Sequence, residues 1–146
     1  MHAAPFVIQV IQVAVTVYVA FVGLLLGSFI NLAVDRVPRG ESVIRPRSHC
    51  RACGRQLNVV DLIPVAGYLL RRGRCATCGA EIGLSSPMVE ALCGSIPLAS
   101  VVWLGVWPGS VVGVGLVAVL GLGLVALAVR PGSRSGKASI PAPRAR

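Results

Sequence analysis

Charged residues are scarce in this chain and absent from long parts of it. Only 13% of the 146 residues are charged, and no Lys or Arg lies before Arg36 or between Arg74 and Arg130. With 55% hydrophobic residues and a mean hydropathy of +0.79, the chain is too apolar for an ordinary soluble domain. A cleaved signal peptide needs a positively charged start and a short apolar core. The uncharged beginning therefore predicts a retained helix instead.

Two apolar stretches are long enough to cross a membrane, which takes about twenty residues. The first is Phe6–Val34, and the second is Met88–Val129, which has room for two helices. The segment WPGS at positions 107–110 lies near the middle of the second stretch, where an interfacial Trp and a Pro-Gly pair suit a turn. The sequence predicts three helices, near residues 6–34, 88–106 and 110–130.

The positive charges predict the orientation in the membrane. All fourteen Lys and Arg residues lie between Arg36 and Arg74 or between Arg130 and Arg146. Because Lys and Arg are enriched in cytoplasmic loops, we expect both segments to be cytoplasmic, and the N-terminus and the WPGS turn to be outside. The net charge of +9 is also typical of nucleic-acid-binding proteins. Charges beside helix ends are explained by topology and anionic lipid, so no nucleic acid is expected as a partner.

Four cysteines form two Cys-x-x-Cys pairs, Cys50 with Cys53 and Cys75 with Cys78. A Gly follows each pair, and four thiolates at this spacing suit a tetrahedral zinc ion. The alternatives are two disulfides, free thiols or a redox-active pair. A cytoplasmic location disfavours disulfides and favours a structural zinc site. The fifth cysteine, Cys93, lies in an apolar stretch and is expected to be a small buried hydrophobic residue.

Four sequence blocks carry a resemblance to a known family. They are GSFINLAVDRVP, RPRSHCRACG, DLIPVAGYLLRRGRCATCG and SSPMVE. In order and spacing they resemble the N-terminal part of the type IV prepilin peptidases (peptidase A24), enzymes of the bacterial inner membrane that cut leader peptides from type IV prepilins and pseudopilins. The resemblance implies that Cys50, Cys53, Cys75 and Cys78 bind zinc in a cytoplasmic loop. It also implies methylation by S-adenosylmethionine, although the sequence contains no Gly-rich cofactor loop.

The carboxylates depart from the pattern of that family. Its peptidases use two aspartates in later helices, the second within Gly-x-Gly-Asp, and this pattern does not occur here. The only aspartates are Asp35, expected to pair with Arg36, and Asp61, expected to cap or form a turn. We expect no dyad sharing a proton, and no catalytic residue in this chain. The remaining acids and histidines are weak candidates: Glu41, Glu81, Glu90, His2 and His49. Glu90 lies near the expected start of the second helix, where a carboxylate interacts favourably with the helix dipole. His49 precedes Cys50 and is at most a spare metal ligand.

The sequence thus predicts an all-α membrane protein with a small zinc-ribbon-like loop domain. Its expected parts are a first transmembrane helix (1–34), a cytoplasmic four-cysteine domain (35–87), a transmembrane hairpin (88–130) and a disordered basic tail along the membrane surface (131–146). The predicted function is a split or accessory prepilin peptidase whose aspartates lie on a separate catalytic partner. The alternative is a non-enzymatic membrane adaptor, or a degenerate relic, that docks pilins or components of pilus and secretion systems. Hydrolysis by this chain alone is the weakest hypothesis.

Overall fold

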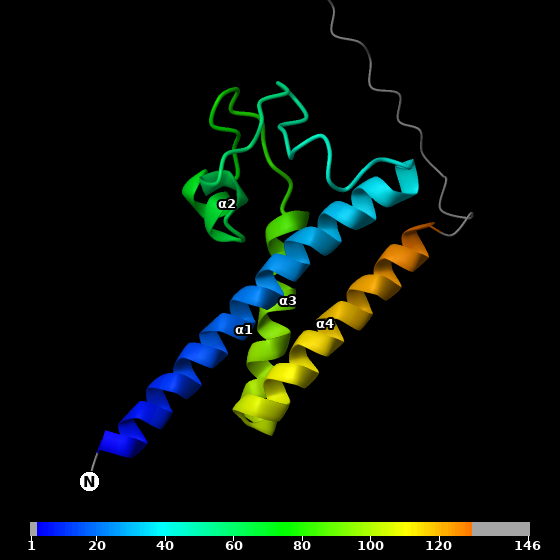
Figure 1. Ribbon diagram of the computed structural model, residues 1–146. Coiled ribbons are helices and arrows are strands. Elements are labelled where there is room, and N and C mark those ends of the chain that lie inside the picture. The colour runs from blue at the N-terminus through cyan, green and yellow to red at the C-terminus, as the bar shows by residue number, and fades with distance from the viewer. Residues whose placement is uncertain (1–2, 130–146) are drawn as a thin grey trace, which may run out of the picture.

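Three long helices and a loop domain make up the computed structural model, which describes residues 3–129 (Figure 1). No β-strand forms within this range. The elements, in chain order, are α1 (Ala3–Arg36), the 3₁₀ turns η1 (Val37–Arg39) and η2 (Val60–Leu62), α2 (Ala66–Leu70), α3 (Ser85–Leu104) and α4 (Val106–Val129). The basic tail predicted for residues 131–146 lies outside the described residues.

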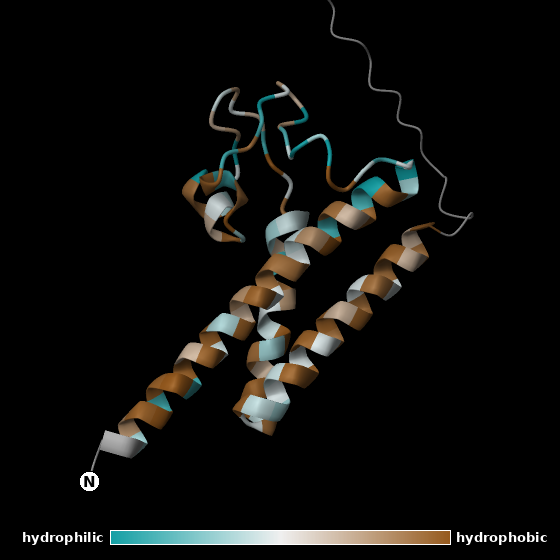
Figure 2. Ribbon diagram, viewed as in Figure 1, coloured by the Kyte–Doolittle hydropathy of each residue, from teal (hydrophilic) through white to brown (hydrophobic). Residues whose placement is uncertain are grey.

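Each long helix is apolar and long enough to cross a membrane. The candidate spans are Pro5–Arg39, Ser85–Leu104 and Val106–Val129. Figure 2 shows that hydrophobic residues cover these helices along most of their length, whereas hydrophilic residues concentrate in the loop domain at one end. The prediction of an all-α membrane protein with three transmembrane helices and a four-cysteine loop is confirmed.

Small residues allow the three helices to pack closely. A Cβ atom added to Gly27 of α1 would lie 2.9 Å from the Cβ of Cys93 and 2.9 Å from the Cα of Glu90, both on α3. On α4, Gly113 packs directly against the backbone of Pro97, whose side chain is fully buried. Without a hydrophobic driving force between helices in lipid, such close van der Waals contact is a main source of association. The bundle is therefore held by close backbone approach, and by large side chains such as Leu24 and Ile30 that pack over glycines of a neighbouring helix.

The hairpin turn between α3 and α4 lies at Gly105, so the prediction of a turn at positions 107–110 was wrong. Gly105 adopts φ 85° and ψ 168°, a conformation that favours glycine. Pro108 lies instead in the first turn of α4, where a helix needs no N–H from it. Trp103 and Trp107, both strongly exposed, flank this turn and suit a membrane interface.

Candidate metal centre

The two Cys-x-x-Cys segments fold into matching knuckles. In each, the N–H of the first cysteine donates to the carbonyl five positions later, and its own carbonyl accepts the N–H of the glycine four positions later. These distances are 2.8 and 2.9 Å in the knuckle that begins at Cys50, and 2.9 and 3.0 Å in the one that begins at Cys75. Gly54 and Gly79 have φ of 72° and 68°, which only glycine adopts without strain. The internal similarity of the sequence is thus a repeat of local structure.

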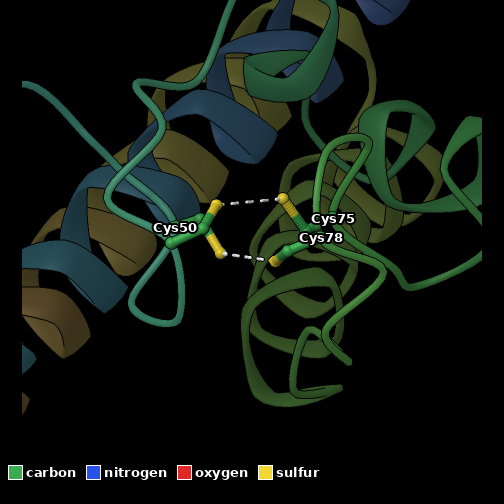
Figure 3. A group of neighbouring side chains, drawn as sticks. Cys50, Cys75 and Cys78 are labelled. Carbon is green, nitrogen blue, oxygen red and sulfur yellow. Dashed lines mark hydrogen bonds between the residues drawn. The ribbon is translucent and has the colours of Figure 1, made fainter. Parts of the chain in front are cut away.

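The knuckles bring all four predicted ligands together. The Sγ atoms of Cys50 and Cys78 are 3.8 Å apart, those of Cys53 and Cys75 are 3.9 Å apart, and all four lie within 4.8 Å of one another. Figure 3 shows Cys50, Cys75 and Cys78 facing one another across the gap between the knuckles. A tetrahedral zinc ion with Zn–S bonds of about 2.3 Å requires sulfurs about 3.8 Å apart. A disulfide requires about 2.05 Å, so the spacing fits a metal ion and not a disulfide.

Backbone N–H groups stabilise the charged form of two of these thiols. The N–H groups of Cys78 and Thr77 lower the pKa of Cys75 to about 6. The equivalent N–H groups in the first knuckle, those of Cys53 and Ala52, also lower the pKa of Cys50. Metal ions bind the thiolate rather than the thiol. The knuckle backbone therefore prepares these sulfurs for a cation.

Asp61 joins the first knuckle to the end of α2. Its carboxylate, 6% exposed, accepts hydrogen bonds from Arg55 and Arg71 at 2.6 Å each, and from the N–H of Asn58 at 3.2 Å. Burial alone would raise the pKa of Asp61, but the donors from Arg71, Asn58 and Arg55 outweigh it and hold the pKa below its usual value. In return, the Asn58 side chain accepts the N–H of Asp61 at 3.0 Å, so the expected turn-forming role is present. The sequence did not reveal the two arginine partners, which lie on opposite sides of Asp61 in the chain.

Asp35 ties the end of α1 to the first knuckle. The prediction that it pairs with Arg36 was wrong: it forms a bidentate ion pair with Arg39, at 2.9 and 2.6 Å, and a second ion pair with Arg51. A residue four positions further along lies on the same helix face, whereas the adjacent residue points elsewhere. Asp35 and Asp61 thus bind different arginines and do not form a carboxylate dyad.

Arg36 has a different structural role. It is 7% exposed and donates to the carbonyls of Ser42 and Pro46, at 2.9 Å each. It therefore fixes the chain that leads from α1 into the first knuckle. A buried guanidinium needs such acceptors, because leaving its N–H groups unpaired would cost free energy.

Glu90 ties α3 to the segment that precedes α2. It is 7% exposed and accepts the N–H of Val65 at 2.7 Å and the hydroxyl of Ser86 at 3.2 Å. We expected only a favourable interaction with the helix dipole, so its contact with the loop was missed. A carboxylate within an apolar helix was the available signal, because such residues usually have a specific partner.

The other candidates lie away from the sulfurs. His49 is exposed and its Nδ1 contacts the carbonyl of Arg47, so the cluster does not include it. Glu41 pairs with Arg39 on the surface, and Glu81 lies 3.8 Å from Arg74 with both side chains exposed. Cys93 packs in the helix interface, as expected, and is only partly buried. His2 lies outside the described residues.

A cleft of ≈770 Å³ separates the loop domain from the helices. Its walls come from the second half of α1, the two knuckles, the segment from η2 to α2 and the start of α3. Apolar side chains such as Phe29 and Leu32 line it beside polar ones such as Asn31 and Ser28. A cleft of this size and mixed lining can accommodate a peptide segment or a small ligand.

The family described as the bacterial peptidase A24 N-terminal domain matches residues 21–104, which include both knuckles, the end of α1 and α3. The chain belongs to this family. A Prepilin leader peptidase/N-methyltransferase of Myxococcus xanthus is 42% identical over 78 residues, which are 53% of this chain and 23% of that protein. The protein of the same name from Bacillus subtilis is 37% identical over 84 residues, 58% of this chain and 34% of that protein.

A third relative has a related name. The Type 4 prepilin-like proteins leader peptide-processing enzyme of Escherichia coli O78:H11 is 34% identical over 116 residues, 66% of this chain and 43% of that protein. The chain therefore spans less than half the length of each of these three curated relatives. No solved structure matches the chain. The resemblance drawn from the four sequence blocks is confirmed, and the chain is a multi-pass membrane protein of this bacterial family.

Proposed function

We propose that this chain is the metal-binding N-terminal module of a prepilin-processing enzyme of the bacterial inner membrane, and that a separate polypeptide supplies the catalytic aspartates. Membership of the peptidase A24 N-terminal domain family supports the first part of the proposal. The observation that carries it is the pair of matching knuckles, which bring four sulfurs within 4.8 Å inside the matched region. The named relatives process prepilins, and this activity is the one we propose for the complete assembly.

We propose zinc as the ion that Cys50, Cys53, Cys75 and Cys78 hold. Four thiolates close a tetrahedral shell and leave no position for a reactive water, so the ion has a structural role. Bound zinc would supply folding free energy to a loop domain that contains little apolar core. The residues of this chain would then position the loop above the ends of α1 and α3 through Asp35, Arg36 and Glu90.

The state of the two aspartates supports a catalytic contribution from residues that this sequence does not contain. An aspartic peptidase needs two carboxyl groups close enough to share one proton. Here Asp35 and Asp61 are each neutralised by two arginines, and they lie at different places in the domain. These pairs stabilise the fold and leave neither carboxylate free to accept a proton from water. Peptide hydrolysis therefore requires aspartates from outside this sequence.

We further propose that the loop domain faces the cytoplasm and that the cleft takes part in binding the prepilin. The nine arginines of the loop support this orientation through the positive-inside rule. In this orientation the cleft between the knuckles and the membrane helices would lie on the cytoplasmic side, where we propose that it receives the leader peptide. The relatives' names include N-methyltransferase. Binding of S-adenosylmethionine by this chain is a weaker proposal, supported by those names alone.

Cleavage of a prepilin reporter tests the proposed function. The reporter is expressed in cells with or without this chain, and loss of the leader is read as a mobility shift. We expect cleavage to disappear without the chain, to return with the wild-type chain, and to stay absent with the Cys50→Ser variant. A Cys93→Ser variant is the matched control, because Cys93 lies outside the sulfur cluster and its loss should leave cleavage intact.

The same experiment separates the enzyme from the adaptor. If cleavage is indifferent to this chain while assembly of pili changes, the chain is a membrane adaptor and the proposed enzymatic role fails. If wild-type chain restores cleavage only together with an aspartate-bearing partner, the split enzyme is supported. Restoration by the chain alone in purified vesicles would instead contradict the need for a partner.

A further inference from the structure

The segment from η2 to α2 exposes a cluster of large apolar side chains, which we call the η2–α2 patch. Val59 is 80% exposed, Leu69 is 67% exposed and Leu70 is 66% exposed. The full patch consists of Val59, Val60, Leu69 and Leu70, whereas the exposed Leu62 and Ile63 line the cleft. Large apolar side chains left exposed together on one short segment indicate contact with a protein or a membrane.

Close backbone packing explains why these side chains point outward. A Cβ atom on Gly67 would lie 2.7 Å from the carbonyl oxygen of Val60 and 2.8 Å from that of Asp61. The backbones of η2 and α2 therefore touch, and no room remains between them for large side chains. The four residues of the patch are left on the outside of this small unit, where they need another environment.

The position of α2 relative to the spans indicates which environment this is. Val65, the residue directly before α2, donates its N–H to the carboxylate of Glu90. With a rise of 1.5 Å per residue, Glu90 lies about 7.5 Å along the axis of α3 from Ser85, the first residue of that helix. Gly27 of α1 faces the backbone of Glu90, and α1 continues without charge to Val34. The attachment point of α2 is therefore alongside apolar helix surface and not beyond it. Figure 1 shows α2 beside the start of α3, with the knuckle loops further from the bundle.

Basic residues border the patch on one side. Arg72 and Arg74 lie within four residues of the end of α2, and both are exposed, with Glu81 3.8 Å from Arg74. Arginines at the edge of an apolar surface can bind anionic lipid headgroups while the apolar side chains enter the acyl region. This arrangement, together with the depth of the attachment point, favours lipid over a protein partner.

We propose that the η2–α2 patch is an interfacial membrane anchor, inserted into the leaflet next to the metal centre. Its ligand is the anionic bilayer that the three long helices cross, contacted by acyl chains at Leu69 and Leu70 and by headgroups at Arg72 and Arg74. The anchor adds a fourth attachment of the chain to the membrane. It fixes the height of the loop domain, and the proposal requires only that the three helices are inserted, not that the chain takes part in prepilin processing.

Fluorescence quenching by brominated lipids tests this proposal. The full chain, with Trp103→Phe and Trp107→Phe, carries either Leu69→Trp or Ile44→Trp in vesicles of phosphatidylcholine and phosphatidylglycerol. Ile44 is the matched control, because it is apolar, 79% exposed and in the same loop, but follows the charged end of α1. For Leu69→Trp we expect lipids brominated near the headgroup to reduce emission about two-fold and aqueous acrylamide to have little effect. Ile44→Trp should behave in the opposite way.

Other outcomes contradict the anchor. Strong acrylamide quenching of Leu69→Trp, with lipid quenching no greater than for Ile44→Trp, would mean that the patch faces water or docks a protein. Metal content and protease resistance of each variant show whether the loop is folded. If Leu69→Trp fails that check, Leu70→Trp repeats the test one residue further along the same surface.

Discussion

Replacing Cys75 with Ser should open the loop domain while the three helices stay inserted. Apart from Pro64, Cys75 is the only buried hydrophobic side chain between Arg36 and Ser85 in the part of the chain that the structure describes. The loop therefore has little apolar burial to offset its conformational entropy. Structural zinc contributes on the order of 10 kcal/mol in small domains. If one ligand of four accounts for a quarter of this, the loop loses about 2.5 kcal/mol, and its open population rises about 60-fold.

Limited trypsin digestion measures this opening directly. The nine arginines from Arg36 to Arg74 lie in the loop or at the end of α1 beside it, whereas residues 75–129 contain no Lys or Arg. Faster cleavage therefore reports the loop and not the helices. We expect the loop of the Cys75→Ser variant, and of the wild type treated with a strong zinc chelator, to be cut faster, and Cys93→Ser to be cut at the wild-type rate. Wild-type cleavage rates in a Cys75→Ser protein that has lost its metal would refute the structural role of the ion.

Three further changes test the packing and the ion pairs. Gly27→Val should destabilise the bundle by about 1–3 kcal/mol in detergent unfolding, because its side chain would collide with α3, whereas Gly115→Val faces open space and should be neutral. Asp61→Asn should destabilise the loop at pH 7 by about 3 kcal/mol. Because the folded pKa of Asp61 lies below its usual value, this deficit should persist above pH 4 and shrink as the pH falls from about 4 through the lower folded pKa, which pH-dependent proteolysis would show. Glu90→Ala should speed hydrogen exchange at the start of α2, whereas Glu81→Ala, which changes an exposed pair, should not.

The sequence was sufficient for features that depend on composition and short spacing. Long uncharged apolar stretches required three helices, and each Cys-x-x-Cys-Gly segment determined the turn that its own backbone forms. That the two knuckles meet could be predicted because a structural zinc ion binds four ligands and each knuckle has only two cysteines. These properties are local, or follow from the ligand requirement of a metal site, so neighbouring residues carry most of the information.

Contacts between residues that lie far apart in the sequence could not be predicted from composition or short spacing. The sequence suggests an ion pair between Asp35 and its immediate neighbour. In the structure, helix geometry brings Arg39 to Asp35 and the folded loop brings Arg51, and both form ion pairs with it. The turn was assigned to Trp107-Pro108-Gly109-Ser110 because of its composition, although a proline is equally compatible with the first turn of a helix. Neither the contact between Glu90 and Val65 nor the outward surface of α2 has a signature in the spacing of residues.

These distant contacts have a common arrangement that bears on function. Asp35 and Arg36 at the end of α1, and Glu90 near the start of α3, all bind the loop that connects these helices. Any movement of α1 against α3 would therefore be transmitted to the knuckles on one side and to α2 on the other. A metal centre held in this way has a defined position relative to the membrane surface. Under the proposed function that position would matter, because a peptide bond to be cut must meet catalytic groups at a fixed depth.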